Sequence, residues 1–407
     1  MGELTAPVLA SPRGSHRPGA TAAHVGARTD PGLPWRRAFA LGVLGFAAYA
    51  AVTAYLERLE ADPHTHQVGD WLISYPGEFV RRGLFGELLF AVAPRGTGAL
   101  WLLFAVQLAL CVPVVAYALR FLHRQDWSWS AIALAAAPAG IAFAGWDPSG
   151  AFRKETIAFA ALALLGFARH RPAGTGRAML RSAALALWVL GVFSWEPTAL
   201  MLPAVVWLLV PGTWTRAGLW WTAAFGAVSA TGLLLSVAHR GDDGAADGMC
   251  QAVLDQGLAP RLCDGAIAWM GLGAHESAES LAELVPVNAA YLLLLPLAAL
   301  PIAFSPWLRA NWRWTAIIAV ATAPLFALGI DYGRWVHILF MQIAICMMLA
   351  PKPMIRSRQW TALATVLYVT TWGLPHAWSH PDAAGWPFRG MLASAIDLVQ
   401  TTLLGWW

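Results

Sequence analysis

The stretch Asp70–Glu87, DWLISYPGEFVRRGLFGE, combines an acid, two adjacent arginines and an apolar run. It follows directly on the first long hydrophobic segment, near residues 38–56. Charged side chains so close to a membrane-spanning segment cost free energy unless they bind a ligand or a partner group. The stretch therefore indicates a membrane scaffold that brings further charges to the same side of the bilayer.

The composition of the whole chain agrees with a membrane scaffold. Of its 407 residues, 58% are hydrophobic and 12% are charged, whereas soluble domains average about 45–50% and about 25%. The apolar residues form continuous blocks close to the about 20 residues that a helix needs to cross a bilayer. We therefore expect an all-α, polytopic membrane protein.

The apolar blocks predict about eleven spans and divide the chain into three parts. Residues 1–34 read as a disordered cytoplasmic tail, 35–374 as the transmembrane domain, and 375–407 as an outer C-terminal tail. The run 83–93 is too short to cross, so we expect an interfacial helix in the first outer loop. The expected spans are 38–56, 98–119, 128–145, 153–168, 180–194, 197–212, 217–238, 285–304, 313–330, 334–350 and 359–374.

The basic residues predict the orientation of the chain. With the N-terminus inside, most of the 27 Lys and Arg residues lie in the tail and the cytoplasmic loops, as the positive-inside rule requires. Of the 23 acids, 20 then lie outside, and 14 of these are in the two large outer loops, 57–97 and 239–284. We expect a multi-pass protein of the inner (plasma) membrane. Its basic residues are explained by this topology, so no nucleic-acid partner is expected.

Two cysteines, Cys250 and Cys263, lie in the second outer loop, whereas the other two cysteines lie in apolar spans. Neighbouring thiols in an oxidising compartment can form a disulfide that closes a short loop. We favour this bond over two unpaired thiols.

Four short charged motifs fall at the predicted outer surface. They come from separate loops, and each stands beside the end of a span. The motifs are Asp70 with Arg81-Arg82; Asp147 with Arg153-Lys154-Glu155; Glu196; and Asp331 with Arg334 and His337.

The cations in these motifs are the most informative feature of the sequence. Arg153 and Lys154 open a span at its outer end, where positive charge opposes both the helix dipole and the usual loop bias. Arg81 and Arg82 also place positive charge in an outer loop, where basic residues are uncommon. A bound anion such as a phosphate would account for all of them.

Each charged residue also has a purely structural interpretation. Arg81 can extend to lipid headgroups, and Arg334 can pair with Asp331 on its own helix. Glu196 precedes a proline that can start a helix, where an acid suits the dipole. His337 alone is more typical of a packed histidine than of a ligand. These alternatives stay open at the level of sequence.

The motifs that the sequence lacks narrow the chemistry. We find no phosphate-binding loop of the Walker type, no dinucleotide-binding GxGxxG, no HExxH and no CxxC. No stretch remains for a large soluble nucleotide-binding domain. An enzyme of this kind would take its substrate from the lipid phase. No metal site is predicted and no cofactor is assigned, although a divalent cation stays open as an alternative.

The chain resembles the C-type membrane glycosyltransferase superfamily, which uses polyprenyl-phosphate sugars. Asp70, in the loop after the first span, stands where that superfamily carries an acidic catalytic base, and the run 83–93 resembles its interfacial helices. Asp70 is followed by Trp71, so the paired acids common in that loop are missing. Asp147 and Glu155 therefore remain rival bases. The strings FVRRG, FRKE and DYGRW are also similar to those of bacterial membrane proteins of surface-polysaccharide synthesis.

The resemblance implies inverting sugar transfer at the extracytoplasmic face, from a polyprenyl-phosphate donor to a glycan, lipid or protein acceptor. Asp70 would take a proton from the acceptor hydroxyl, and the cations with Glu196, Asp331 and His337 would form the phosphate and substrate site. Two alternatives remain: a polysaccharide polymerase or ligase that uses lipid-pyrophosphate glycans, and a lipid-linked sugar transporter or flippase.

Overall fold

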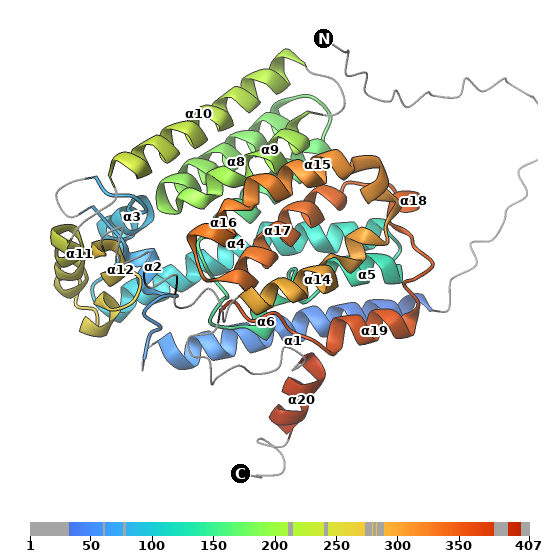
Figure 1. The fold of residues 1–407 in the computed structure, drawn as a ribbon, viewed down its shortest axis with the longest axis horizontal. Coiled ribbons are helices and arrows are strands. Elements are labelled where there is room, and N and C mark those ends of the chain that lie inside the picture. The colour runs from blue at the N-terminus through green and yellow to red at the C-terminus, as the bar shows by residue number, and fades with distance from the viewer. Residues whose placement is uncertain are drawn as a thin grey trace, which may run out of the picture.

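The computed structural model describes residues 32–59, 62–75, 79–210, 215–239, 243–272, 279, 282, 289–377 and 390–399. All regular structure in these ranges is helical, as expected. Among the described residues, four helices are long and apolar enough to cross a bilayer, and three of them, α1, α8 and α10, run along the length of the molecule in Figure 1. These four are α1 (Leu33–Leu59), α4 (Thr97–Arg124), α8 (Thr175–Ser194) and α10 (Arg216–Ala238).

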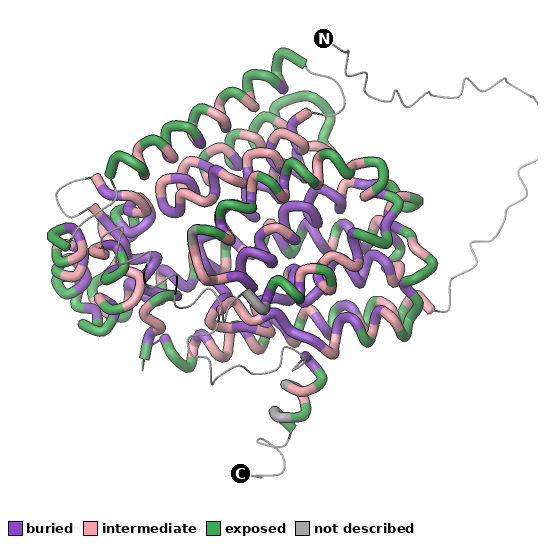
Figure 2. The backbone as a smooth tube through the Cα atoms, viewed as in Figure 1, coloured by how far each residue is buried: buried purple, intermediate pink, exposed green. Residues whose placement is uncertain are grey.

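The exposed surface of α10 is apolar. Trp220, Leu234 and Val237 are 77%, 72% and 64% exposed, and Figure 2 shows much of this helix as exposed. Water would make such a face unstable, whereas lipid tails make it ordinary. The few buried positions of α10 include Phe225 and Ser229, which face α8: Trp188 of α8 donates its indole N–H to the Ser229 hydroxyl at 3.0 Å. The helix therefore has one protein-facing stripe and a lipid-facing remainder.

The other seven expected spans are shorter helices or helix pairs, so the count of eleven stays a prediction. Prolines at helix starts and breaks account for much of the shortening, because proline lacks an amide donor. These elements are α5 (Trp129–Ala135), α6 (Phe143–Trp146), α7 (Glu155–Arg169), η1 (Glu196–Met201), α9 (Leu202–Leu209), η3 (Ala289–Leu293), α14 (Leu294–Ala303), α15 (Pro306–Thr322), α16 (Pro324–Leu328), α17 (Tyr332–Met347) and α19 (Ala362–Thr370).

The expected span 128–145 is broken between α5 and α6. Pro138 lies in the break, where it can donate no backbone hydrogen bond. The carbonyl of Ala139 accepts a hydrogen bond from Nδ1 of His337 at 2.9 Å, and the His337 ring stacks on Phe143 with centroids 4.2 Å apart. Irregular backbone at membrane depth needs such side-chain partners. His337 therefore has a structural role here, as the packed-histidine interpretation expects, and its part in a substrate site stays a prediction.

The described parts of the two loops that are predicted to face outward, called the outer loops below, lie together at one end of the bundle (Figure 1). The amide of Gly96 donates to the carbonyl of Gln256 at 2.7 Å, and the amide of Arg81 donates to the carbonyl of His239 at 3.1 Å. Cys250 and Cys263 form the expected disulfide. The expected short helix at 83–93 is present as α3. The elements here are α2 (Gly69–Leu72), α3 (Leu84–Val92), α11 (Asp243–Asp255), η2 (Pro260–Cys263) and α12 (Ala268–Gly271).

The core of the bundle is formed around α7 and α17, which are buried along most of their lengths (Figure 2). Helix α7 packs against α4, α8 and α17. Both core helices begin near the end that carries the outer loops, so their first turns bring charged residues next to α2 and α3. Two short helices complete the described chain, α18 (Lys352–Ile355) at the opposite end and α20 (Met391–Val399) after α19.

Candidate functional site

The four charged motifs meet where α7 and α17 begin, beneath the first outer loop. Asp70, Arg153, Lys154, Glu155 and Arg334 are all buried there. They come from stretches that are up to 264 residues apart in the chain. Buried ionised groups are stable only when they are paired or hydrogen-bonded, so the partners of each group decide what it can do.

Lys154 links the first motif to the second. Its side chain is fully buried, and its Nζ lies 3.7 Å from Oδ1 of Asp70 and 3.2 Å from the carbonyl of Arg82. Phe152, two residues before Lys154, has a left-handed backbone with φ 55°. Its carbonyl accepts hydrogen bonds from the Trp71 indole at 2.8 Å and the Gln107 amide at 3.0 Å. These two bonds hold the turn that directs Lys154 toward Asp70.

Arg82 links the first motif to the third. It binds Glu196 through a fork, with Nε to Oε2 and Nη2 to Oε1 both at 2.8 Å, and Arg81 adds a contact to Oε1 at 3.3 Å. Arg82 also has a left-handed backbone, with φ 70°. Non-glycine residues in this region cluster at functional sites, where the surroundings hold them.

Arg334 links the second motif to the fourth. Its guanidinium binds Glu155 through a fork, with Nε to Oε1 at 2.8 Å and Nη2 to Oε2 at 2.6 Å. Nη1 binds Asp331 at 3.2 Å, as expected for a residue that orients Arg334. The same group lies 5.1 Å from the centre of the Trp195 ring, which places the third motif beside the fourth.

Arg153 differs from the other cations. Its Nη1 donates to the carbonyl of His66 at 2.6 Å and its Nε to that of Ser149 at 3.3 Å. Within the part of the chain that the structure describes, Arg153 forms no ion pair with a carboxylate. The network of Arg81, Arg82, Arg153, Lys154 and Arg334 with Asp70, Glu155, Glu196 and Asp331 thus has one more cation than acid.

The three candidate bases have different surroundings. Glu155 gives both oxygens to Arg334. Asp147 accepts from the Gly150 amide at 2.9 Å and from the ring and backbone nitrogens of His376, with the ring Nδ1 at 2.5 Å. Asp70 has one long ion pair, to Lys154, among the described residues. Of the three, Asp70 is the carboxylate with capacity left to accept a proton.

The charges around Asp70 keep it ionised. Burial by itself raises the pKa of this carboxyl, because a charged form is poorly solvated in the interior. Lys154, then Arg82 and the other nearby cations, more than offset burial, so the pKa of Asp70 lies below its ordinary value. The carboxylate is therefore unprotonated at neutral pH, as a general base must be.

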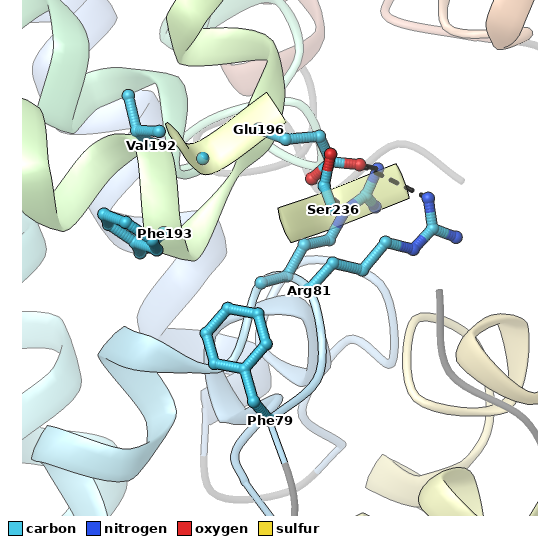
Figure 3. A pocket seen from close by; sticks show the side chains of 8 residues that line it. Phe79, Arg81, Val192, Phe193, Glu196 and Ser236 are labelled. Carbon is cyan, nitrogen blue, oxygen red and sulfur yellow. Dashed lines mark hydrogen bonds and ion pairs between the residues drawn. The ribbon is translucent and has the colours of Figure 1, made fainter. Parts of the chain in front are cut away.

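A small pocket, with a volume of about 10 Å³ that would hold about one water molecule, lies beside Arg81 and Arg82 (Figure 3). One wall is apolar and comes from α8. Gly232 of α10 lies so close to Val192 that a Cβ there would overlap its side chain, so the two helices approach closely at this pocket. The lining residues are Phe79, Arg81, Arg82, Val192, Phe193, Glu196, Gly232 and Ser236.

The expectation of cations held open for an outside anion is met only in part. Arg82 and Arg334 bind the protein carboxylates Glu196 and Glu155, so their forks are filled. Glu196 is accordingly a partner for arginine. Arg81 also pairs with Glu196, so Arg153, which forms no ion pair with a carboxylate in the described chain, is the cation that best fits the expectation.

Sequence reasoning did not connect His376 with the site. It stands in the segment after α19, and its partner Asp147 lies 229 residues earlier. No spacing rule relates residues so far apart; a histidine just beyond the end of a span was the one signal. Among the described residues, no group of three or more His, Cys, Asp or Glu side chains is arranged to hold a metal ion.

Comparisons with known proteins give no relative for this chain. No family model matches it, and neither does any curated protein or solved structure. The relationship to the C-type membrane glycosyltransferases therefore remains a proposal that rests on sequence likeness and on the geometry of the charged network.

Proposed function

We propose that this protein is a membrane glycosyltransferase that moves a sugar from a polyprenyl-phosphate donor to an acceptor hydroxyl at the extracytoplasmic face of the plasma membrane. One observation carries the proposal. A buried carboxylate with spare hydrogen-bonding capacity, Asp70, shares a network with a buried guanidinium, Arg153, that forms no ion pair in the described chain. A base and an anion-seeking cation are the two groups that this transfer requires.

The reaction follows from these two groups. Asp70 takes the proton of the acceptor hydroxyl while the hydroxyl oxygen attacks the anomeric carbon of the donor. The bond from that carbon to the phosphate oxygen breaks, and the lipid phosphate leaves with the electron pair. Arg153 would offset the charge that grows on the phosphate, with Lys154 next to it in the chain. The paired forks of Arg82 and Arg334 hold the surrounding loops in position.

The pocket beside Arg81 suits a lipid-borne donor. The pocket itself has room for about one water molecule, so a donor would lie at its mouth, where Val192 and Phe193 offer an apolar surface beside Arg81 and Arg82. It lies between α8 and α10, whose outer surfaces are apolar. A donor that diffuses in the bilayer would therefore meet Arg81 and Arg82 on its way to Arg153.

Asp70→Asn tests the proposal, because the amide keeps the shape of the side chain but cannot act as a base. The purified protein in lipid nanodiscs is given a panel of prenyl-phosphate hexoses and pentoses with membrane glycolipid acceptors. We expect the rate of lipid-phosphate release with a glycosylated product to fall at least about 100-fold. Asp264→Asn, an exposed acid of the same outer face, is the matched control and should keep full activity.

Two results would end the proposal. Full transfer by Asp70→Asn would remove Asp70 as the base. Movement of unmodified prenyl-phosphate sugar across the bilayer, with no product, would identify a transporter instead. Transfer from prenyl pyrophosphate glycans, and not from monophosphate sugars, would favour a polymerase or ligase.

A further inference from the structure

The chain after α19 returns across the candidate site in the segment 371–377. Trp372 and Leu374 are buried, which anchors the segment 371–377 to the bundle. Beyond them, His376 reaches the loop that carries Asp147 and the first turn of α17. This segment therefore touches two of the four charged motifs at once.

The contact with the Asp147 loop uses both the backbone and the side chain of His376. Its ring Nδ1 lies 2.5 Å from Oδ2 of Asp147, and its own amide donates to the same oxygen. The second oxygen of Asp147 accepts from Gly150 at 2.9 Å. One carboxylate thus ties His376 to the turn that leads directly to Arg153.

The contact with α17 uses the carbonyl of His376. It accepts hydrogen bonds from the amides of Gly333 at 3.0 Å and Arg334 at 3.4 Å. Both faces of the segment lie against glycine. A Cβ on Gly333 would overlap the carbonyl of Pro375, and one on Gly150 would come within 3.0 Å of the His376 Cβ. The segment fits only because neither neighbour has a side chain.

One of the two tied loops carries Arg153, the cation of the proposed phosphate site, and the other carries Arg334, which supports that site through its ion pairs. Arg153 donates through Nε to the Ser149 carbonyl, within the turn that Asp147 stabilises. Arg334 follows Gly333 and holds both Glu155 and Asp331. A shift of either loop would move one cation relative to the other, and an error of about 1 Å in such a site can cost about 100-fold in rate.

We propose that His376 is a positioning residue that clasps the Asp147–Arg153 loop to the start of α17 and so fixes the distance between Arg153 and Arg334. This inference rests on the proposed function for its effect on transfer, but the clasp itself is a property of the fold. His376 touches no reacting atom in this scheme. Its imidazole acts through Asp147, and its carbonyl acts through the amides of α17.

Hydrogen exchange of the protein in nanodiscs tests the clasp without any substrate. His376→Ala should raise the exchange rates of the peptide amides around Gly150, Gly333 and Arg334 at least about tenfold, because it removes a charge-assisted hydrogen bond that holds the segment. His376→Asn keeps a side-chain N–H for Asp147 and should restore most of the protection. His123→Ala, an exposed histidine elsewhere in the chain, should leave these peptides unchanged.

Kinetics then separate positioning from chemistry. We expect His376→Ala to lower kcat/KM for the prenyl-phosphate donor at least about tenfold, and His376→Asn to recover it to within about threefold. Loss of transfer in His376→Asn with normal exchange would mean that the imidazole takes part in the chemistry, which would overturn the positioning role. Wild-type exchange in His376→Ala would overturn the clasp.

A second variant acts on the other side of the segment. Gly333→Ala introduces the Cβ that overlaps Pro375 and should displace the segment without touching the imidazole, so exchange should rise around Asp147 as well. Gly226→Ala in α10 meets nothing within 4 Å and is the control for a glycine change. If Gly333→Ala leaves the Asp147 peptide protected, the two loops are not coupled through this segment. Absence of any transfer by the unmodified protein would refute the proposed function, while the exchange data would still decide the clasp.

Discussion

The ion pair between Glu155 and Arg334 offers a strong test of how the buried network is stabilised. Both side chains are almost fully buried, and two short hydrogen bonds join them. Removing one partner of a buried pair costs about 3–5 kcal/mol, mainly because a charge is left unpaired. Replacing both partners by apolar residues of similar volume is often neutral or stabilising.

The contacts in the structure rank the three variants by their expected loss of unfolding free energy. Glu155→Leu leaves Arg334 with Asp331, so its cost should lie near the lower limit, about 3 kcal/mol. Arg334→Met leaves Glu155 without its only ion-pair partner in the described chain, so its cost should approach about 5 kcal/mol. The double variant leaves only Asp331, which is partly exposed to solvent, and should cost about 1 kcal/mol.

The free energy of unfolding in bicelles, measured by steric trapping, provides the assay. The coupling energy between the two sites, which is the difference between the summed single costs and the double cost, should be about 7 kcal/mol. Asp126→Asn, which removes the charge of the exposed pair with Lys352, is the control and should cost less than about 1 kcal/mol. A double variant whose cost equals the sum of the two single costs would refute the reasoning, since the two side chains would then act independently.

Two further predictions concern the outer loops. His64 accepts hydrogen bonds at Nδ1 from the amides of His66 and Gln67, both at 3.3 Å, and burial, with Arg153 nearby, lowers its pKa from 6.5 to about 4. As the pH falls, His64 therefore takes up a proton in the unfolded chain before it does so in the folded chain, and the free energy of unfolding should drop by about 1–2 kcal/mol between pH 6.5 and 4 after allowance for solvent screening. In His64→Asn, whose side-chain carbonyl can accept the same hydrogen bonds, this drop should be smaller. An unchanged drop would exclude His64 as its source. Cys250→Ser opens a loop of 13 residues and should lower the unfolding free energy by up to about 3 kcal/mol, so dithiothreitol should lower the Tm of the wild type and not that of the variant. Equal shifts in both proteins would contradict this account.

The sequence predicted the parts of the fold that depend on local pattern. The length of the apolar runs predicted the four long helices, and an apolar run too short to cross a bilayer predicted α3. The disulfide between Cys250 and Cys263 followed from the position of both thiols in one outer loop. The broken helix at Pro138 was missed, because the surrounding alanines kept the hydropathy high through the break.

The site was predictable as a set of residues, but its pairs were not, apart from the local pair of Asp331 and Arg334 on one helix turn. Charges that oppose the loop bias marked Arg81, Arg82, Arg153 and Lys154, and the structure does bring their motifs together. The partner of Arg334 lies 179 residues away at Glu155. Which acid binds which cation depends on helix packing, and one sequence contains no information on contacts at that distance.

The length of α7 has a consequence for the acceptor. Fifteen residues rise about 22 Å, which is about 8 Å less than the hydrocarbon thickness of a typical bilayer. If its inner end sits level with the cytoplasmic headgroups, Lys154 and Glu155 at its other end lie about 8 Å below the opposite headgroup boundary. Under the proposed function, an acceptor must then bring its hydroxyl group down to that depth, which the slender end of a sugar chain or a lipid headgroup can do and a flat, rigid surface cannot.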